Sequence, residues 1–241
     1  MAGSDRLRLD DQPGYVLHSY PFRETSLVVE IFTRHHGRVA LVARGARRPR
    51  SAVRGVLLAF QPLLLSWYGK NELRTLHKAE WQGGMPQLQG RALICGFYIN
   101  ELLLKLTARD DPHEALFDRY TETLRELGET DAHAIVLRRF ERRLLQELGY
   151  GLILDLDVET NDPIQPDTLY RYVVEQGPVR GTGEGNGVQL RGKTLLDMAN
   201  DDYADPITQQ QSKLLMRTLI NHHLGEHTLH TRQLLRDLQE L

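Results

Sequence analysis

The stretch RETSLVVEIFTRHHGRVALVARGARRPRSAVRG, residues 23–55, decides the fold of the first part of this chain. Residues 26–33 and 38–43 are rich in Val, Ile, Leu, Phe and Thr, as β-strands are. Residues 35–37, His-His-Gly, separate the two runs as the turn of a hairpin does. The second run leads directly into GARRPR, residues 45–50. The stretch therefore predicts a β-hairpin that ends in an arginine-rich loop.

The charge of this stretch is one-sided, because no acidic residue occurs between Glu30 and Glu72. The whole chain has a formal net charge of −2, but residues 1–90 hold 13 Lys+Arg against 7 Asp+Glu, whereas the rest holds 17 against 25. A cationic surface on a small β-domain favours contact with a phosphate backbone. Seven arginines are the predicted DNA-binding residues: Arg34, Arg38, Arg44, Arg47, Arg48, Arg50 and Arg54. Aromatic residues of the same region are candidates for base stacking, although most are expected in the core: Tyr15, Tyr20, Phe22, Phe32, Trp67 and Tyr68.

The rest of the chain predicts an α+β protein with a small barrel followed by helices. Five short strands joined by tight turns favour a closed barrel over a sandwich: 15–22, 26–34, 38–44, 56–69 and 72–81. Apolar residues then recur at helical spacing, which predicts helices over 89–108, 113–127, 132–148, 194–200, 205–224 and 231–241. The predicted organisation is a disordered tail (1–14), a barrel (15–85), a first helical part (86–149), an irregular segment (150–190) and a second helical part (191–241). One short hairpin is expected near residues 169–175, within the irregular segment.

The sequence contains none of the phosphate-binding or nucleophile motifs that mark common enzyme classes. The glycines of GTGEGNG, residues 181–187, follow no apolar strand and predict a flexible loop rather than a phosphate site. Asp155, Asp157 and Glu159 alternate, so on a strand they would share one face; this leaves open a divalent-metal nuclease, against the simpler interpretation of a solvated acidic edge. His222, His223, His227 and His230 include an i, i+4 pair that could bind zinc, against the simpler interpretation of a solvated helix end. No cofactor is expected.

The single cysteine, Cys95, excludes an internal disulfide and fits a reducing compartment. The polar N-terminal residues do not have the apolar core of a secretory signal, and no run of residues approaches the length of a membrane span. The sequence predicts a cytoplasmic protein with no membrane contact.

Several stretches resemble the RecO family of bacterial recombination mediators. They are VLHSYPFRETSLVVEIFTRHHGRVALVARGARRPRS (16–51), FQPLLLSWYGKNELRTLHKAE (60–80), YINELLLKL (98–106), LRRFERRLLQELGYG (137–151) and YRY (170–172). They occur in the family's order and span most of the chain. The resemblance implies a five-stranded OB-fold barrel, an all-helical domain and a middle segment that holds a four-cysteine zinc module in some relatives. Because no cysteine occurs within residues 150–190, we expect this segment to be a loop-rich, metal-free insert.

The resemblance also implies a function without bond-breaking chemistry. RecO-like proteins bind single- and double-stranded DNA, anneal complementary strands, and work with RecR to let RecA replace the single-strand binding protein SSB. In the family the acidic SSB tail docks on the helical domain. This makes Arg138 the leading candidate for the tail carboxylate, followed by Arg139 and Arg142, while the alternative is that these arginines pair with Glu141 and Glu147 on a solvated helix face. A protein-only adaptor that binds through its helical half is a further alternative.

Overall fold

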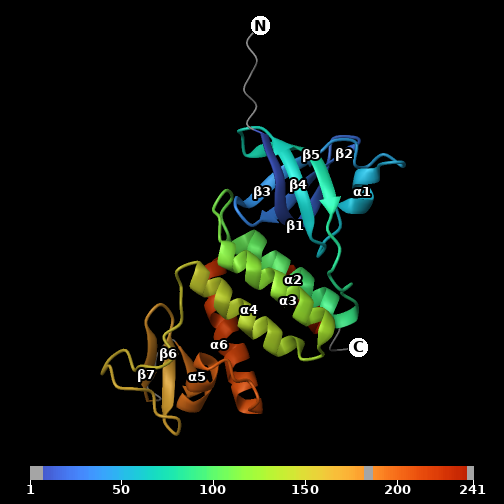
Figure 1. Cartoon of the computed structure of the whole chain (residues 1–241). Coiled ribbons are helices and arrows are strands. Elements are labelled where there is room, and N and C mark those ends of the chain that lie inside the picture. The colour runs from blue at the N-terminus through green and yellow to red at the C-terminus, as the bar shows by residue number, and fades with distance from the viewer. Residues whose placement is uncertain (1–7, 182–186, 238–241) are drawn as a thin grey trace. The chain divides into compact units, whose positions relative to one another are not determined.

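A computed structural model of the chain describes residues 8–181 and 187–237 and divides into two compact units, residues 1–131 with 229–241 and residues 132–228. Unit 1 contains β1 (Arg8–Phe22), β2 (Ser26–Thr33), β3 (Gly37–Ala43), α1 (Ala52–Val56), β4 (Leu63–Tyr68), β5 (Leu73–Trp81), α2 (Gly90–Leu106), α3 (Glu114–Glu129) and α7 (His230–Asp237) (Figure 1). Unit 2 contains α4 (His133–Glu147), β6 (Leu169–Val173), β7 (Gly177–Arg180), β8 (Val188–Arg191), α5 (Gly192–Ala199) and α6 (Pro206–Leu224). The predicted α+β class is confirmed.

The first five strands close into a barrel in the order β1-β2-β3-β5-β4, with β4 pairing back to β1. All neighbours are antiparallel except β3 and β5. Alternate residues of the strands point inward, as the period of two requires, and Ile31, Leu41, Leu65 and Trp67 are at most 1% exposed. The predicted hairpin and five-stranded barrel are therefore confirmed.

The first strand begins earlier than the sequence predicts. Residues 8–14, expected to belong to a disordered tail, pair with β4 as part of β1; residues 1–7 lie outside the described residues. Its polar residues and Pro13 do not show the apolar alternation of a strand. The pairing with β4 is irregular between Leu9 and Gln12. There Asp11 adopts a φ of +50°, and its N–H donates to Ser66 Oγ at 3.1 Å. The irregularity lets Leu9 still pack against the barrel core.

The predicted strand over residues 56–69 is also wrong in its first half. Residues 52–56 form the short helix α1, and the strand begins only at Leu63, directly after Pro62. Leu57 is 9% exposed and packs into the barrel core from the end of α1. Residues 56–62 resemble a strand in sequence because a segment that packs against the end of a barrel core has apolar residues, as a strand does.

A buried asparagine joins the barrel to the helices of unit 1. The pairing of β1 with β2 is interrupted between Val16 and His18. Asn100 of α2, 1% exposed, donates from Nδ2 to the Leu17 carbonyl oxygen at 3.0 Å, and Tyr120 of α3 donates from its hydroxyl to Asn100 Oδ1 at 2.6 Å. The side chain thus satisfies a backbone carbonyl at the irregularity in the strand.

This network makes stability depend on pH at the alkaline end. Burial raises the pKa of Tyr120 well above its usual value near 10. The folded state therefore favours the protonated hydroxyl of Tyr120. The stability that this preference contributes is fully present below the unfolded-state pKa, near 10, and is lost as the pH rises through the folded-state pKa. The Tyr120→Phe variant should be about 1–2 kcal/mol less stable at pH 8. Between pH 10 and 11 its free energy of unfolding should fall less steeply than that of the wild type, by up to about 1.4 kcal/mol per pH unit; urea unfolding at each pH measures both effects, and parallel pH profiles would contradict them.

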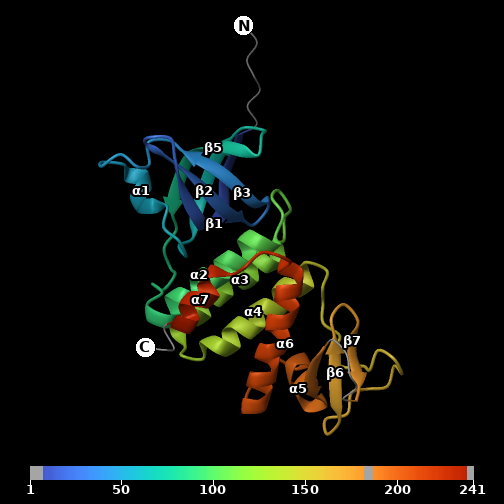
Figure 2. The same ribbon diagram turned by 180° about the vertical axis from the view of Figure 1, so that it is seen from behind.

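The chain returns to unit 1 through α7, which lies against α2 in Figure 2. Glu101 of α2 accepts hydrogen bonds from the backbone N–H groups of His230 and Thr231, each at 2.9 Å, and from the Thr231 hydroxyl at 2.6 Å. Burial would raise the pKa of Glu101, but these hydrogen bonds outweigh it and lower the pKa. The carboxylate therefore caps α7 from another helix.

Unit 2 corrects the predicted irregular segment. β6, β7 and β8 form a three-stranded antiparallel sheet in the order β7-β6-β8 rather than one hairpin. The sequence did not predict β8, because it has only four residues and leads directly into α5. Residues 182–186, most of the predicted flexible loop, lie outside the described residues. The six predicted helices are found within a few residues of their predicted bounds, apart from residues 238–241, which lie outside the described part. No helix in the described part is long and apolar enough to cross a membrane.

Candidate nucleic-acid interface

Two of the seven predicted DNA-binding arginines have carboxylate partners inside unit 1. Arg38 Nη1 lies 2.9 Å from Oε2 of Glu30, which is 3% exposed and also pairs with Arg109. Arg34 Nη1 lies 2.8 Å from Oδ1 of Asp118, on α3. The guanidinium groups of Arg34 and Arg38 are therefore engaged in ion pairs within unit 1, and we leave both residues out of the candidate interface.

The other five arginines lie on one exposed loop, which we call the basic loop and define as residues 44–54. It consists of the connection after β3 together with most of α1, and it projects from the barrel in Figure 1. Its arginines are all exposed: Arg44, Arg47, Arg48, Arg50 and Arg54. Within residues 8–181 and 187–237, no ion pair joins any of the five to a carboxylate. Their positive charge is therefore available to an outside partner.

Backbone hydrogen bonds hold the basic loop in place. The N–H of Arg47 donates to the Thr25 carbonyl at 2.9 Å, and the N–H of Arg48 donates to the Gly45 carbonyl at 3.1 Å. Gly45 has a φ of +68°, a conformation that favours glycine. The arginines thus project from an ordered backbone, which lowers the entropy lost when they bind phosphate.

The structure adds an arginine that the sequence did not single out. Arg47 Nη1 donates to the carbonyl oxygen of Arg23 at 3.2 Å, which brings the turn between β1 and β2 beside the basic loop. Arg23 is exposed, and its guanidinium lies 5.2 Å from the ring centre of Phe22. The order of the strands alone could have indicated that Arg23 lies beside the basic loop, because the β1–β2 turn and the end of β3 lie at the same end of a three-stranded meander.

Burial decides among the candidate stacking aromatics. Tyr15, Phe32 and Trp67 are at most 2% exposed and belong to the core. Tyr20 is 46% exposed on β1, and its ring centre lies 4.4 Å from that of His18 in an edge-on arrangement. Of the six candidates, Tyr20 is therefore the one best placed to stack on a base.

The three arginines predicted to bind a partner all face carboxylates in unit 2. Arg138 Nη2 lies 2.7 Å from Oε1 of Glu141, the partner that the alternative prediction named. Asp201 pairs with both Arg139, at 2.6 Å, and Arg142, at 3.7 Å. Sequence reasoning missed Asp201, since it follows the arginines by about sixty residues.

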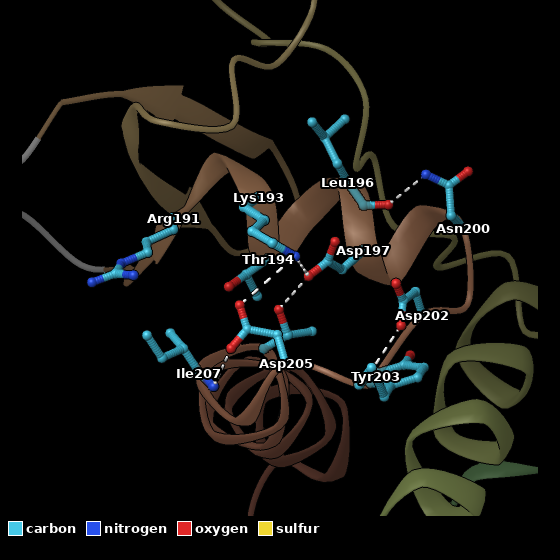
Figure 3. Close-up of polar contacts among 12 residues, drawn as sticks. Arg191, Lys193, Thr194, Leu196, Asp197, Asn200, Asp202, Tyr203, Asp205 and Ile207 are labelled. Atoms are coloured by element: carbon cyan, nitrogen blue, oxygen red, sulfur yellow. Dashed lines mark hydrogen bonds and ion pairs between the residues drawn. The ribbon is translucent and has the colours of Figure 1, made fainter.

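Asp201 is followed by a turn that leads from α5 to α6, and Figure 3 shows the polar contacts of Asp202 and Asp205 in this turn. Asp202 Oδ1 accepts the N–H of Ala204 at 3.0 Å, and Asp205 Oδ1 accepts the N–H of Ile207 at 2.8 Å at the start of α6. Lys193 Nζ lies 2.5 Å from Asp197 and 3.7 Å from Asp205. The acidic residues of this turn are thus used in capping and ion pairing.

The structure contradicts the hypothesis of a nuclease metal site. Asp157 is 2% exposed, and its carboxylate accepts backbone N–H groups of Glu159 at 2.9 Å, Thr160 at 3.3 Å and Arg180 at 3.0 Å. It fastens a loop to β7 and is not free to bind a cation. Within the described residues, no group of three or more His, Cys, Asp or Glu side chains is arranged to hold a metal ion.

The histidine cluster likewise serves other contacts. His222 Nε2 lies 3.1 Å from Glu175 Oε1, and the ring of His223 stacks on Tyr150 with centres 3.9 Å apart. Burial lowers the pKa of His223, with a smaller contribution from His222. The neutral ring favoured by this shift suits stacking.

Family models match nearly the whole chain. One described as "Recombination protein O N terminal" matches residues 9–85, and one described as "Recombination protein O C terminal" matches residues 87–233. The chain belongs to the RecO family. The protein named "DNA repair protein RecO" of Nitrosospira multiformis is 57% identical over 242 residues, which cover 98% of this chain and 99% of that protein. The proteins of the same name from Aromatoleum aromaticum and Dechloromonas aromatica are 57% and 55% identical, over 99% and 98% of this chain and 100% and 99% of their own lengths.

Membership in the RecO family confirms the resemblance seen in the sequence and places the chain in DNA repair and recombination. RecO proteins are recombination mediators and are generally non-catalytic. The boundary between the two family models, at residues 85–87, falls between β5 and α2. The basic loop therefore belongs to the RecO N-terminal domain.

Proposed function

We propose that this RecO-family chain binds single- and double-stranded DNA through the basic loop, anneals complementary strands, and acts with RecR to help RecA replace SSB. The observation that carries the proposal is the set of five exposed arginines that have no carboxylate partner within the described residues. The sequence suggested seven arginines for this surface. Because Arg34 and Arg38 form ion pairs within unit 1, the remaining five lie on one continuous segment, the basic loop.

The chemistry of the basic loop suits a phosphate backbone rather than a base sequence. A guanidinium group can pair with phosphate through two parallel hydrogen bonds. Contacts to phosphate are made equally to any sequence and to either form of DNA. A cationic surface that holds two strands lowers their mutual repulsion, which supplies a route to annealing without ATP.

For the acidic SSB tail we propose the arginines of α4, Arg138, Arg139 and Arg142. Arg139 and Arg142 share one carboxylate, that of Asp201, on a half-exposed face of unit 2. A tail carboxylate would make the same kind of pair and would compete with Asp201 for it. The Arg138–Glu141 pair is more buried, since the Arg138 side chain is only 12% exposed. Arg138 would therefore contribute mainly to the shape and positive charge of this face.

An annealing assay on SSB-coated complementary strands tests the DNA and partner parts of the proposal together. The wild-type protein should accelerate annealing of strands coated with intact SSB, and a smaller acceleration is expected when the SSB tail has been removed. Annealing of bare strands should not depend on the tail. Equal rates with and without the protein on bare strands would contradict the proposed annealing activity, and equal rates with intact and tailless SSB would contradict the partner site.

A further inference from the structure

Trp81 is the most exposed large apolar side chain in the described part of the chain, with 61% of its surface open to solvent. It is the last residue of β5, and it was not among the aromatic residues that the sequence singled out. Its indole N–H donates to Gln61 Oε1 at 3.0 Å, which holds the ring in one orientation. A ring that is both exposed and held in place loses little entropy when another flat group stacks on it.

The indole of Trp81 lies beside the helical end of the basic loop. Ala79, two residues earlier on β5, packs against the barrel core, as do Val53 and Val56 of α1. Side chains two residues apart on a strand point to the same side, so Trp81 is on the side of β5 that faces α1. Figures 1 and 2 both show the end of β5 next to α1. Arg54, one of the five exposed arginines of the basic loop, is on this helix.

The surroundings of the ring favour a base over a protein surface as its partner. A protein interface has an apolar core, whereas the residues next to Trp81 in the sequence, Glu80 and Gln82, and its hydrogen-bond partner Gln61 are polar. Glu80 does not add an unpaired negative charge, because its carboxylate pairs with Lys78 Nζ at 2.7 Å. A single exposed ring beside a cationic segment matches a nucleotide, which combines a flat base with an anionic phosphate.

We infer that Trp81 stacks on an unpaired base of single-stranded DNA whose backbone lies on the basic loop. This inference rests on the proposed function and deepens it. The arginines bind either form of DNA, and Trp81 adds affinity for the single-stranded form, because the bases of a duplex are already stacked and paired. During annealing, pairing with a second strand withdraws the base from Trp81, so the finished duplex is held less tightly than either separate strand.

The tryptophan fluorescence of the wild-type protein tests the inference without any variant. The chain has two tryptophans, and Trp67 is 1% exposed in the barrel core, so a bound base can stack only on Trp81. Oligothymidine should quench the emission of Trp81, because stacking on a base quenches an indole. An oligonucleotide of abasic sites offers the same phosphates without bases and should leave the emission unchanged. Unquenched emission with saturating oligothymidine would overturn the inference.

Variants of the ring test the same point by affinity. Trp81→Ala should reduce the affinity for oligothymidine about tenfold, while the affinity for duplex and for the abasic oligonucleotide stays within about twofold. Trp81→Phe keeps an aromatic ring and should recover most of the loss. Leu58→Ala is the matched control, since it removes another exposed apolar side chain close to the end of α1, 54% exposed, and should bind like the wild type.

The outcomes separate the role of Trp81 from the proposed function. If Trp81→Ala keeps the wild-type ratio of oligothymidine to abasic affinity, no base stacks on Trp81; the inference is overturned, and the basic loop remains the DNA-binding surface. Equal losses for all three DNAs would also overturn it, because they would show that Trp81 supports the basic loop rather than a base. If the wild-type protein binds none of the three DNAs, the proposed function itself fails and the inference fails with it.

Discussion

The variant Arg47→Glu/Arg48→Glu/Arg50→Glu is expected to bind oligothymidine at least about 100-fold more weakly than the wild type. Three phosphate contacts are lost, each contributing about 1 kcal/mol or more as a charge-assisted hydrogen bond, and about 1.4 kcal/mol corresponds to a factor of ten. The added carboxylates also repel the phosphates. Fluorescence anisotropy at fixed salt measures the change, and duplex DNA should show a loss of similar size.

A charge-matched control separates the position of the arginines from the net charge. Arg91, Arg125 and Arg217 are exposed on α2, α3 and α6, and reversing all three to Glu changes the net charge of the chain by the same amount. This variant should keep an affinity within a few-fold of the wild type. Equal losses in the two triple variants would show that overall charge, and not the basic loop, governs binding.

The second large effect concerns stability and is expected for Glu30→Ala. The Glu30 carboxylate, 3% exposed, is the counter-charge of Arg38, whose side chain is 14% exposed. Removing one member of a buried ion pair leaves the other charge desolvated and unpaired, which typically costs about 3–5 kcal/mol. Urea unfolding of the Glu30→Ala variant should show a loss of this order, without any direct loss of a DNA contact.

Two comparisons test the physical reason. The double variant Glu30→Leu/Arg38→Leu removes both buried charges and leaves only Arg109, whose side chain is 39% exposed and can be solvated. It should therefore be more stable than Glu30→Ala, since a buried pair can often be replaced by apolar residues at little cost. Glu80→Ala breaks an exposed pair with Lys78 on β5 and should have little effect. A loss for Glu30→Ala no larger than for Glu80→Ala would contradict the account of Arg38 as a structural residue.

The barrel could be predicted from the sequence because its strands are local and apolar. The hairpin of β2 and β3 follows from residues 26–43 alone, and its turn at residues 35–37 fixes the pairing of Phe32 with Arg38. That register also places Glu30 diagonally across from Arg38 on the same face. The internal ion pair of Arg38 was therefore within reach of sequence reasoning, although it was not predicted.

Other features depend on contacts that no local pattern records. Asp118, which neutralises Arg34, is 84 residues away in the sequence, and Asp201 is remote from Arg139. Residues 8–14 are polar and become a strand because they pair with the apolar residues of β4.

The salt dependence of single-strand binding tests the central claim most directly. If the five arginines of the basic loop each contact a phosphate, the logarithm of the association constant should fall with the logarithm of the salt concentration at a slope of about −3.5, from −0.7 for each of five contacts. The variant Arg47→Glu/Arg48→Glu/Arg50→Glu should retain a slope of about −1.4, from two contacts. A wild-type slope near zero, or the same slope in the wild type and this variant, would contradict the claim that the basic loop binds the DNA backbone.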